Sequence, residues 1–317
     1  MDHRPRGAWI TPDESIALCG AAATVTANGP DRFGTVRRQA TALFERTTVQ
    51  DSVPEAARPR LFGGFAFHDG QRPSDSPWSG FEGAWFVLPA AQFTRVDDSW
   101  WLTTTATGPD AARTAEERLD QWTDEVERVT DPSLTTTPSV VARDRTPSFD
   151  GWQSQISAAL ERVESGELEK VVLAQSLTLA LANDLVEPDV LFRLGDTYPD
   201  CYRFLFTPPD AGTFFGATPE RLVSRDGLTV RTEALAGSTG RGDTPAEDEW
   251  LAAELLDSDK DRHEHELVVD AIREQLAPVA SAVSTGPLSV RRLATVQHLE
   301  TAISADLKTD DHVLSLV

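Results

Sequence analysis

The sequence predicts an α+β protein, and two patterns carry that prediction. Residues 1–145 contain short apolar and aromatic runs separated by turn residues, which is typical of a strand-rich subdomain. In residues 146–317, similar runs alternate with apolar residues at helical spacing, which predicts a mixed second part. The turn Arg225-Asp226-Gly227 joins two segments of that part and predicts a tight hairpin, because Asp-Gly suits positions with positive φ.

The first part is expected to be mostly strands with two helices. Residues 31–45 and 110–129 predict the helices, the second of them strongly charged and exposed. Short segments predict the strands: 8–10, 22–26, 61–67, 84–89, 92–95 and 99–105. Residues 131–147 contain three prolines and a threonine run, and they predict a linker.

The second part is expected to alternate helices and strands. Helical spacing begins at Trp152, and Gly166 suits the end of that helix. Thr244-Pro245-Ala246-Glu247 is a capping box that predicts one long helix to about Ala277, before Pro278. The other predicted elements are a short helix at 188–194 and strands at 169–175, 201–206, 213–217, 228–235 and 291–297.

The formal net charge of −22 restricts the partners of this protein. Nucleic acids and anionic membranes are polyanions, so neither is an expected partner. Abundant acidic residues with few lysines are typical of a salt-loving organism, so we expect the melting temperature to fall as molar salt is diluted. Two cysteines, no signal peptide and no apolar run of about 18 residues predict a soluble cytoplasmic protein without a disulfide framework.

Lys170 stands at the head of the predicted buried strand 169–175, on the same face as Val172 and Ala174. The chain has only three lysines among 29 Lys and Arg residues, so arginine is its usual cation. A lysine in such a strand can serve as a group that loses its proton, which arginine cannot do. The alternative is a lysine at the end of a strand whose ammonium group reaches solvent.

Two further residues stand out as polar groups in apolar surroundings. Glu264 lies on the apolar stripe of the predicted long helix, where a carboxylate is costly unless it is paired or binds a metal. It can bind a metal, or it can pair with Lys260 one turn earlier and tilt outward. His298 follows a predicted strand, and a lone histidine there is more often a core residue than a ligand.

Five segments, in their order and spacing, resemble the chorismate-utilising enzymes, and most closely their isochorismate synthases of menaquinone and siderophore pathways. The segments are Lys170-Val171-Val172-Leu173-Ala174, Gly216-Ala217-Thr218-Pro219-Glu220, Glu233-Ala234-Leu235-Ala236-Gly237-Ser238, residues 258–267, and Val296-Gln297-His298-Leu299. The clear part of the resemblance covers residues 147–304. It implies two layered, mostly antiparallel sheets with helices outside and the active site between them.

The resemblance implies an isomerase that converts chorismate to isochorismate. Lys170 then looks like the base that activates water for attack at C2, and Glu220 like the acid that protonates the departing C4 hydroxyl. A lysine base must be neutral and a glutamic acid donor must keep its proton, so their pKa values must move in opposite directions. The alternative for Glu220 is a surface carboxylate paired with Arg221.

The resemblance also implies binding groups for substrate and cofactor. Glu264 looks like a Mg²⁺ ligand, which suits a dianionic substrate such as chorismate. Ala236, Gly237 and Ser238 look like a wall of the substrate pocket, with His298 as a further substrate contact. His263 and His265 are two residues apart, on different sides of a helix, and do not form a zinc pair.

Single residue positions distinguish the other enzymes of this family from isochorismate synthases. Anthranilate synthases usually carry glutamine in place of Lys170, and aminodeoxychorismate synthases of the covalent type carry a nucleophilic lysine in place of Ala236. Both are therefore disfavoured alternatives. Salicylate synthases share Lys170 and Glu220 and add pyruvate elimination, so they stay open.

The chain departs from the family at its end. The family continues beyond Val317 with a segment that carries the second Mg²⁺ glutamate, and residues 310–317 look like the start of a helix leading into it. The rival hypothesis is therefore an inactive fragment or partner-binding remnant of the same fold. Its unpaired sheet edges would favour self-association or a complementing C-terminal fragment.

Overall fold

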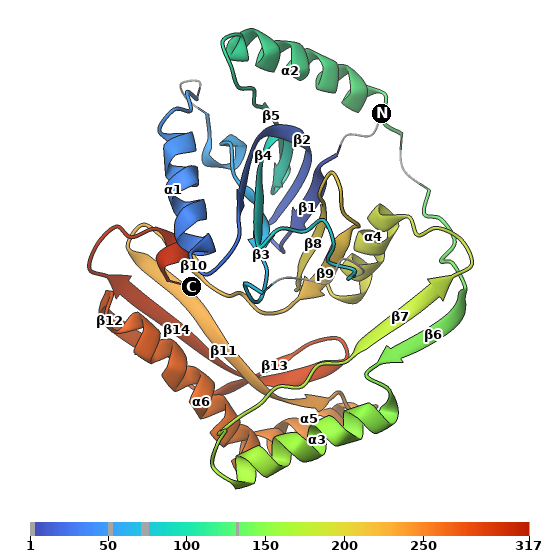
Figure 1. Ribbon diagram of the computed structural model, residues 1–317, viewed down its shortest axis with the longest axis vertical. Coiled ribbons are helices and arrows are strands. Elements are labelled where there is room, and N and C mark those ends of the chain that lie inside the picture. The colour runs from blue at the N-terminus through green and yellow to red at the C-terminus, as the bar shows by residue number, and fades with distance from the viewer. Residues whose placement is uncertain (1–3, 50–52, 71–75, 131–132, 317) are drawn as a thin grey trace. The chain divides into compact units, whose positions relative to one another are not determined.

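The computed structural model describes all residues except 1–3, 50–52, 71–75, 131–132 and 317 (Figure 1). The chain forms two compact units. Unit 1 comprises Met1–Asp131 and Leu191–Val317, and unit 2 comprises Pro132–Val190. The predicted division after residue 145 falls within a strand of unit 2, so these units follow a different partition of the chain.

A seven-stranded antiparallel sheet forms the first half of unit 1. Its order is β3-β4-β2-β1-β8-β9, and β5 also pairs with β4. The strands are β1 (Arg6–Ile10), β2 (Glu14–Ala27), β3 (Phe62–Phe65), β4 (Ala84–Val96), β5 (Ser99–Thr104), β8 (Tyr202–Thr207) and β9 (Phe214–Thr218). The predicted α+β class with antiparallel sheets is confirmed, and the segments predicted separately at 84–89 and 92–95 are one continuous strand.

Helix α1 (Arg32–Phe44) packs against this sheet through Val36, which forms a buried cluster with Val25 and Ala84. Leu314, from the 3-10 turn η2 (Val313–Ser315), packs on the same cluster. The predicted helix start at 310–317 is therefore only this short turn within the described residues. The turn η1 (Glu55–Ala57) and the exposed helix α2 (Ala111–Glu127) complete this part of the fold.

A five-stranded antiparallel sheet forms the second half of unit 1, in the order β10-β11-β14-β12 with β13 also paired to β14. The strands are β10 (Ser224–Asp226), β11 (Thr229–Gly240), β12 (Ala280–Thr285), β13 (Ser289–Arg292) and β14 (Val296–Leu307). The predicted strand 291–297 is wrong in its bounds, because the chain turns between Arg292 and Val296. Arg292 and Gln297 pair across that turn.

Two helices cover one face of this second sheet, where a single long helix was predicted (Figure 1). They are α5 (Pro245–Asp257) and α6 (Asp259–Leu276). Ser258 interrupts them with extended backbone, and its hydroxyl accepts a hydrogen bond from the Asp261 amide. Serine competes well for exposed amides at a helix start, so the chain begins a new helix here. Leu276 of α6 joins Ile303 in the buried core of this half.

Unit 2 holds the two-stranded sheet of β6 (Val140–Thr146) and β7 (Ser176–Leu181) with helix α3 (Phe149–Glu164). The linker predicted at 131–147 is wrong in that it includes β6. Helix α3 has no buried residue among those described, and large apolar side chains of both strands are exposed. Helix α4 (Glu187–Thr197) spans the boundary to unit 1.

The buried strand predicted at 169–175 is wrong. These residues carry no strand in the structure, and the side chain of Val172 is 80% exposed. The ladder of β7 begins only at Ser176, which pairs with Thr146. Pro147 follows Thr146 and has no N–H to continue the pairing, so the apolar run before Ser176 meets no neighbouring strand among the described residues.

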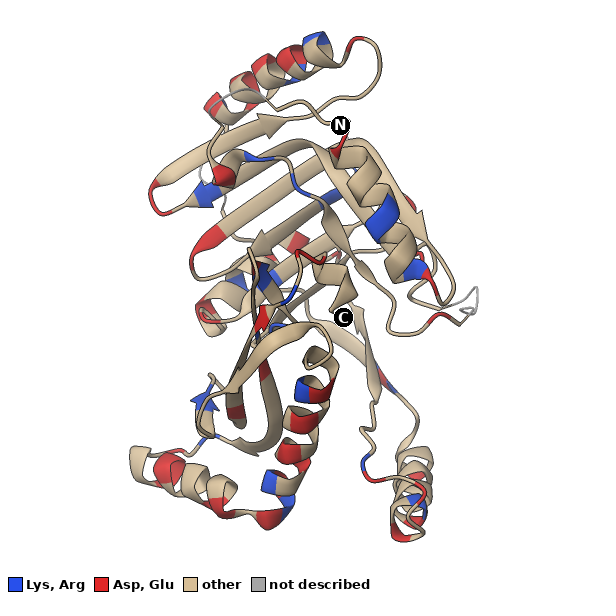
Figure 2. Ribbon diagram, turned by 90° about the vertical axis from the view of Figure 1, so that its left-hand side faces the viewer, with Lys and Arg blue, Asp and Glu red and all other residues tan. Residues whose placement is uncertain are grey.

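The negative charge is spread over the surface elements of the chain. Figure 2 shows acidic residues along helices and at strand ends, interspersed with fewer basic ones. Within the described parts of the chain, no helix is long and apolar enough to cross a membrane.

Candidate functional site

The second sheet of unit 1 has one apolar and one polar face. Along β14, odd-numbered residues from Gln297 to Leu307 are buried, whereas the even-numbered residues are not. Side chains alternate along a strand, so His298 and Glu300 share the face opposite α6. Arg291 of β13 lies directly across from His298, and Glu233 of β11 lies on the same face by register. This polar face is the candidate site.

The predicted pocket wall lies at a bulge in β11. The register with β14 shifts between Leu235 and Ser238, and Gly237 has a φ of +79°. A side chain at Gly237 would also press on Asp261 and Leu299, 3.2 Å from the position of its Cβ. Glycine therefore allows the strand to bend here against α6.

Ser238 and His298 meet across the two strands. The Ser238 hydroxyl lies 2.7 Å from Nδ1 of His298. Partial burial, with a smaller contribution from Arg291, lowers the pKa of His298. The ring is therefore held neutral more readily than an exposed histidine, and it can exchange hydrogen bonds with a ligand on the polar face.

His265 anchors the bulge from the helix side. The residue is only 3% exposed, with Nδ1 3.2 Å from the Ala236 carbonyl and Nε2 2.8 Å from the Thr301 hydroxyl. A carbonyl only accepts, so Nδ1 donates to Ala236 and Nε2 accepts from Thr301. This one side chain ties α6 to both β11 and β14 beside the predicted pocket wall.

Glu220 follows β9 in the loop that leads to the second sheet. Its amide donates to the Thr218 hydroxyl at 3.2 Å. The pKa of its carboxyl group is raised, first by partial desolvation and then by the nearby Glu233 carboxylate, while Arg291 opposes the shift. A raised pKa is the direction that a carboxylic proton donor requires.

An ion-pair network lies beside Glu220. Both Nη atoms of Arg291 donate to the Glu233 carboxylate, at 3.3 and 3.2 Å, and Nη2 also donates to Glu300. The Glu233 side chain is only 7% exposed. Arg221 approaches the same carboxylate with its guanidinium at 3.7 Å. The alternative considered for Glu220 was a surface carboxylate paired with Arg221, and the structure gives that arginine an ion pair with Glu233.

Among the described residues, Glu264 is not part of a complete metal site. It is half-buried on α6, one residue before His265. Within the described residues, no group of three or more His, Cys, Asp or Glu side chains could hold a metal ion. Mg²⁺ commonly uses one or two carboxylates and keeps several waters, so Glu264 fits the role of one ligand.

Lys170 belongs to unit 2, whereas the other six predicted site residues belong to unit 1. It is half-buried in the loop between α3 and β7. The structure brings Ser238 together with His298, and it places Ala236 and Gly237 at the same bulge.

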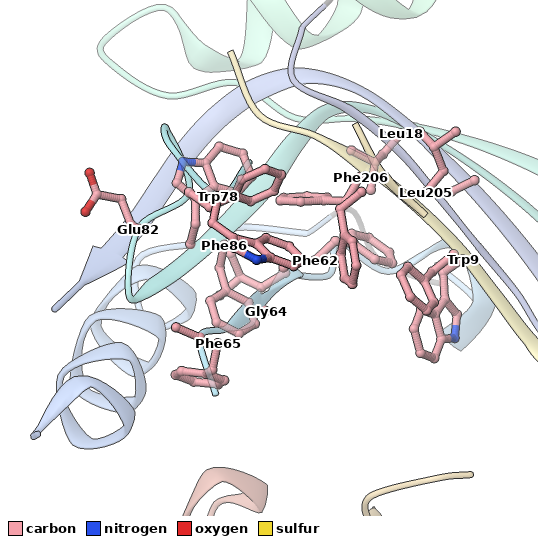
Figure 3. A pocket seen from close by; sticks show the side chains of 18 of the residues that line it. Trp9, Leu18, Phe62, Gly64, Phe65, Trp78, Glu82, Phe86, Leu205 and Phe206 are labelled. Carbon is pink, nitrogen blue, oxygen red and sulfur yellow. The ribbon is translucent and has the colours of Figure 1, made fainter. Parts of the chain in front are cut away.

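A separate cavity of about 930 Å³ lies on the first sheet of unit 1 and is lined mainly by aromatic side chains (Figure 3). Figure 3 shows Trp9, Phe62, Phe86 and Phe206 around it. None of the seven predicted site residues is among the described residues that line it. Its lining also includes His68 and three charged residues: Glu14 and Arg60 pair with each other at 2.8 Å, and Glu82 accepts a hydrogen bond from Asn28 at 2.6 Å.

Sequence reasoning missed Glu233, Arg291, Glu300 and His265 as members of the site. Glu233 carried a signal that could have found it. It stands between Thr232 and Ala234 in an apolar strand, and a buried carboxylate there requires a cationic partner. The identity of that partner, 58 residues further along the chain, depends on strand pairing that no local pattern reveals.

Residues 3–317 match the family model described as chorismate binding enzyme. The chain belongs to the chorismate-binding enzyme family. It is 32% identical to the salicylate biosynthesis isochorismate synthase of Pseudomonas aeruginosa over 98% of this chain and 64% of that protein. It is 29% identical to isochorismate synthase MenF of Bacillus subtilis over 98% of this chain and 67% of that protein.

The solved structures of family members support the fold. The menaquinone-specific isochorismate synthase MenF from Escherichia coli matches with a TM-score of 0.78 at 23% identity, over 99% of this chain and 68% of that one. Anthranilate synthase component I from Streptococcus pneumoniae matches with a TM-score of 0.74 at 18% identity, over 96% and 71%. The chain thus spans about two thirds of the length of these relatives, and 45% of the isochorismate synthase of Catharanthus roseus.

Proposed function

We propose that this chain carries out isochorismate synthase chemistry, the Mg²⁺-dependent conversion of chorismate to isochorismate. Water adds at C2 of chorismate and the C4 hydroxyl leaves as water, so the net reaction is an isomerisation. The observation that carries the proposal is the raised pKa of Glu220 beside the polar face that also holds Ser238 and His298. The isochorismate synthases among its relatives support the same reaction.

The proposed roles follow the chemistry of each side chain. Lys170, once neutral, takes a proton from the attacking water, and Glu220 gives a proton to the departing hydroxyl. Ser238, His298 and the backbone of the Ala236–Gly237 bulge bind and orient the substrate. Glu264 provides one carboxylate to Mg²⁺, which, when bound, would offset the negative charge of the substrate carboxylates.

Product analysis tests this proposal. The chain is incubated with chorismate and Mg²⁺ in molar salt, and the products are separated by chromatography. Isochorismate is the expected product, and Lys170→Ala and Glu220→Gln should each lower kcat by about 100-fold or more, the usual contribution of a positioned acid or base. The exposed Lys308→Ala and Glu254→Gln are matched controls and should stay within about twofold of the parent.

The other outcomes each assign a different function. Salicylate with pyruvate would move the chain to the salicylate synthases, and anthranilate formed from added ammonia would move it to the anthranilate synthases. No turnover by a folded chain that also fails to bind chorismate would overturn the enzyme proposal and favour a partner-binding remnant of the fold.

A further inference from the structure

Glu233 and Arg291 hold the two peptide groups that flank Glu220. The Arg221 amide, on one side, donates to Oε1 of Glu233 at 3.0 Å. The Pro219 carbonyl, on the other side, accepts from Nη1 of Arg291 at 2.7 Å. The ion pair thus holds the backbone immediately before and immediately after Glu220, and both hydrogen bonds go to main-chain groups rather than to the Glu220 side chain.

The ion-pair network that holds this loop is rigid because each of its side chains comes from a paired strand. Glu233 lies in β11, Arg291 in β13 and Glu300 in β14, and all three strands belong to one antiparallel sheet. The planar guanidinium fork of Arg291 bridges the two carboxylates, which fixes its orientation. A loop residue held from a sheet in this way keeps its position better than one held by the loop alone.

We propose that the Glu233–Arg291 ion pair is the positioning device for Glu220, which fixes the loop so that this carboxyl group faces the substrate. The inference rests on the proposed role of Glu220 as the proton donor. A buried ion pair that only stabilised the fold would need no contact with this loop, since such pairs can often be replaced by apolar residues at little cost. Here the hydrogen bonds lead to the backbone on both sides of the proposed acid.

The same pair influences the charge state of Glu220. Behind desolvation, the Glu233 carboxylate raises the pKa of Glu220 and the Arg291 guanidinium lowers it. The other charged or titratable groups of this network are Arg221 in the loop, and Glu300 and His298 on β14. The two members of the pair therefore act on Glu220 in opposite directions, which a test can separate.

The first test is an NMR titration of the Glu220 carboxyl carbon in the full chain. Replacing Glu233 by glutamine (Glu233→Gln) removes a repulsive neighbour and should lower the pKa of Glu220. Arg291→Gln removes an attractive neighbour and should raise it. If Glu220 were not held beside the pair, neither change would alter the charge next to it, and its pKa would stay unchanged or fall in both variants through exposure to water. A fall in both variants, or no change in either, would overturn the proposal.

A charge-conserving variant tests the proposal even if the Glu233→Gln and Arg291→Gln proteins fail to fold. Arg291→Lys keeps the positive charge but loses the two-pronged contact with Glu233 and Pro219. We expect kcat for chorismate to fall on the order of tenfold to 100-fold through misplacement of Glu220, with KM changed much less. Asp270→Asn and Arg273→Gln, which break an exposed pair on α6, are the matched controls. An unchanged kcat in Arg291→Lys would contradict positioning.

These measurements separate the two proposals. Opposite pKa movements at Glu220 in a parent chain that neither converts nor binds chorismate would support the fixed placement of Glu220 and refute the enzyme function. Turnover that depends on Glu220 but is indifferent to Glu233 and Arg291 would support the function and refute the device. In an active chain, the alkaline limb of the kcat profile should move to lower pH in Glu233→Gln, because a proton donor with a lower pKa is lost earlier as pH rises.

Discussion

The second sheet of unit 1 and the small sheet of unit 2 have similarly apolar sequences but very different burial. Leu299 in β14 is fully buried, and Val230 and Ile303 lie in the same helix-covered half of the fold. Leu179 in β7 is 44% exposed, and no residue of α3 is buried among those described. Apolar patterning therefore shows which residues favour burial, whereas neighbouring strands and helices decide whether they obtain it.

The difference also separates the proposed catalytic groups. Glu220, Glu264 and the bulge residues lie on elements tied together by paired strands and by His265. Lys170 lies in a loop of the unit with the exposed apolar side chains. We expect the local stability around the proposed acid to exceed that around the proposed base, and four predictions test this contrast.

Amide hydrogen exchange should show the largest effect. Amides of β11 and β14 are expected to exchange only through global unfolding, and those of β6 and β7 through local opening at much lower free energy. The ratio of exchange rates should be on the order of 1,000 or more in the native chain, because few buried contacts hold the small sheet. Mass spectrometry of peptides from both sheets measures it. Equal protection in the two sheets would contradict the contrast.

The second largest effect is expected for the free energy of unfolding when a leucine from each sheet is replaced by alanine. Leu299→Ala should lower the free energy of unfolding by about 3 kcal/mol, because a fully buried side chain leaves a cavity in β14. Leu179→Ala should change it by less than about 0.5 kcal/mol, since its side chain is already in contact with water. Urea denaturation followed by tryptophan fluorescence compares both. A cost above about 2 kcal/mol for Leu179→Ala would mean that β7 is buried in solution.

The two histidines of α6 form the third pair. His265→Ala should destabilise the chain by about 2 kcal/mol, because it leaves the buried Ala236 carbonyl and Thr301 hydroxyl without their shared partner. His263→Ala, at an exposed position two residues earlier, should stay within about 0.5 kcal/mol. Thermal unfolding at neutral pH distinguishes them, and similar losses in both variants would refute the anchoring role of His265.

The sequence predicted most elements of unit 1 because their apolar periods and turn residues agree with their tertiary partners. The hairpin at Asp226-Gly227 and the helix that starts after Thr244 are formed as expected. Strand 169–175 failed although its composition is equally β-favourable, because its pairing ends at Pro147. The long helix failed at Ser258, where a good capping residue competes with helix continuation.

The site was less accessible to sequence reasoning than the fold. Ser238 and His298 came from the family resemblance, and the structure places them in contact. Buried polarity correctly drew attention to α6, but the buried polar residue is His265, while Glu264 is only half-buried. The Glu233–Arg291 contact joins strands 58 residues apart, and such a pairing depends on the register of three strands together.

Helix caps provide the smallest effect and the most closely matched pair. Ser258 caps α6 and Ser148 caps α3, each accepting a hydrogen bond from an amide three residues later. Ser258→Ala should lower the free energy of global unfolding by about 1 kcal/mol, the usual value of such a cap. Ser148→Ala should leave global unfolding unchanged and instead speed exchange of the α3 amides, because a helix without buried residues opens on its own. Equal losses of global stability would show that α3 unfolds together with unit 1, and would remove the contrast between the two units.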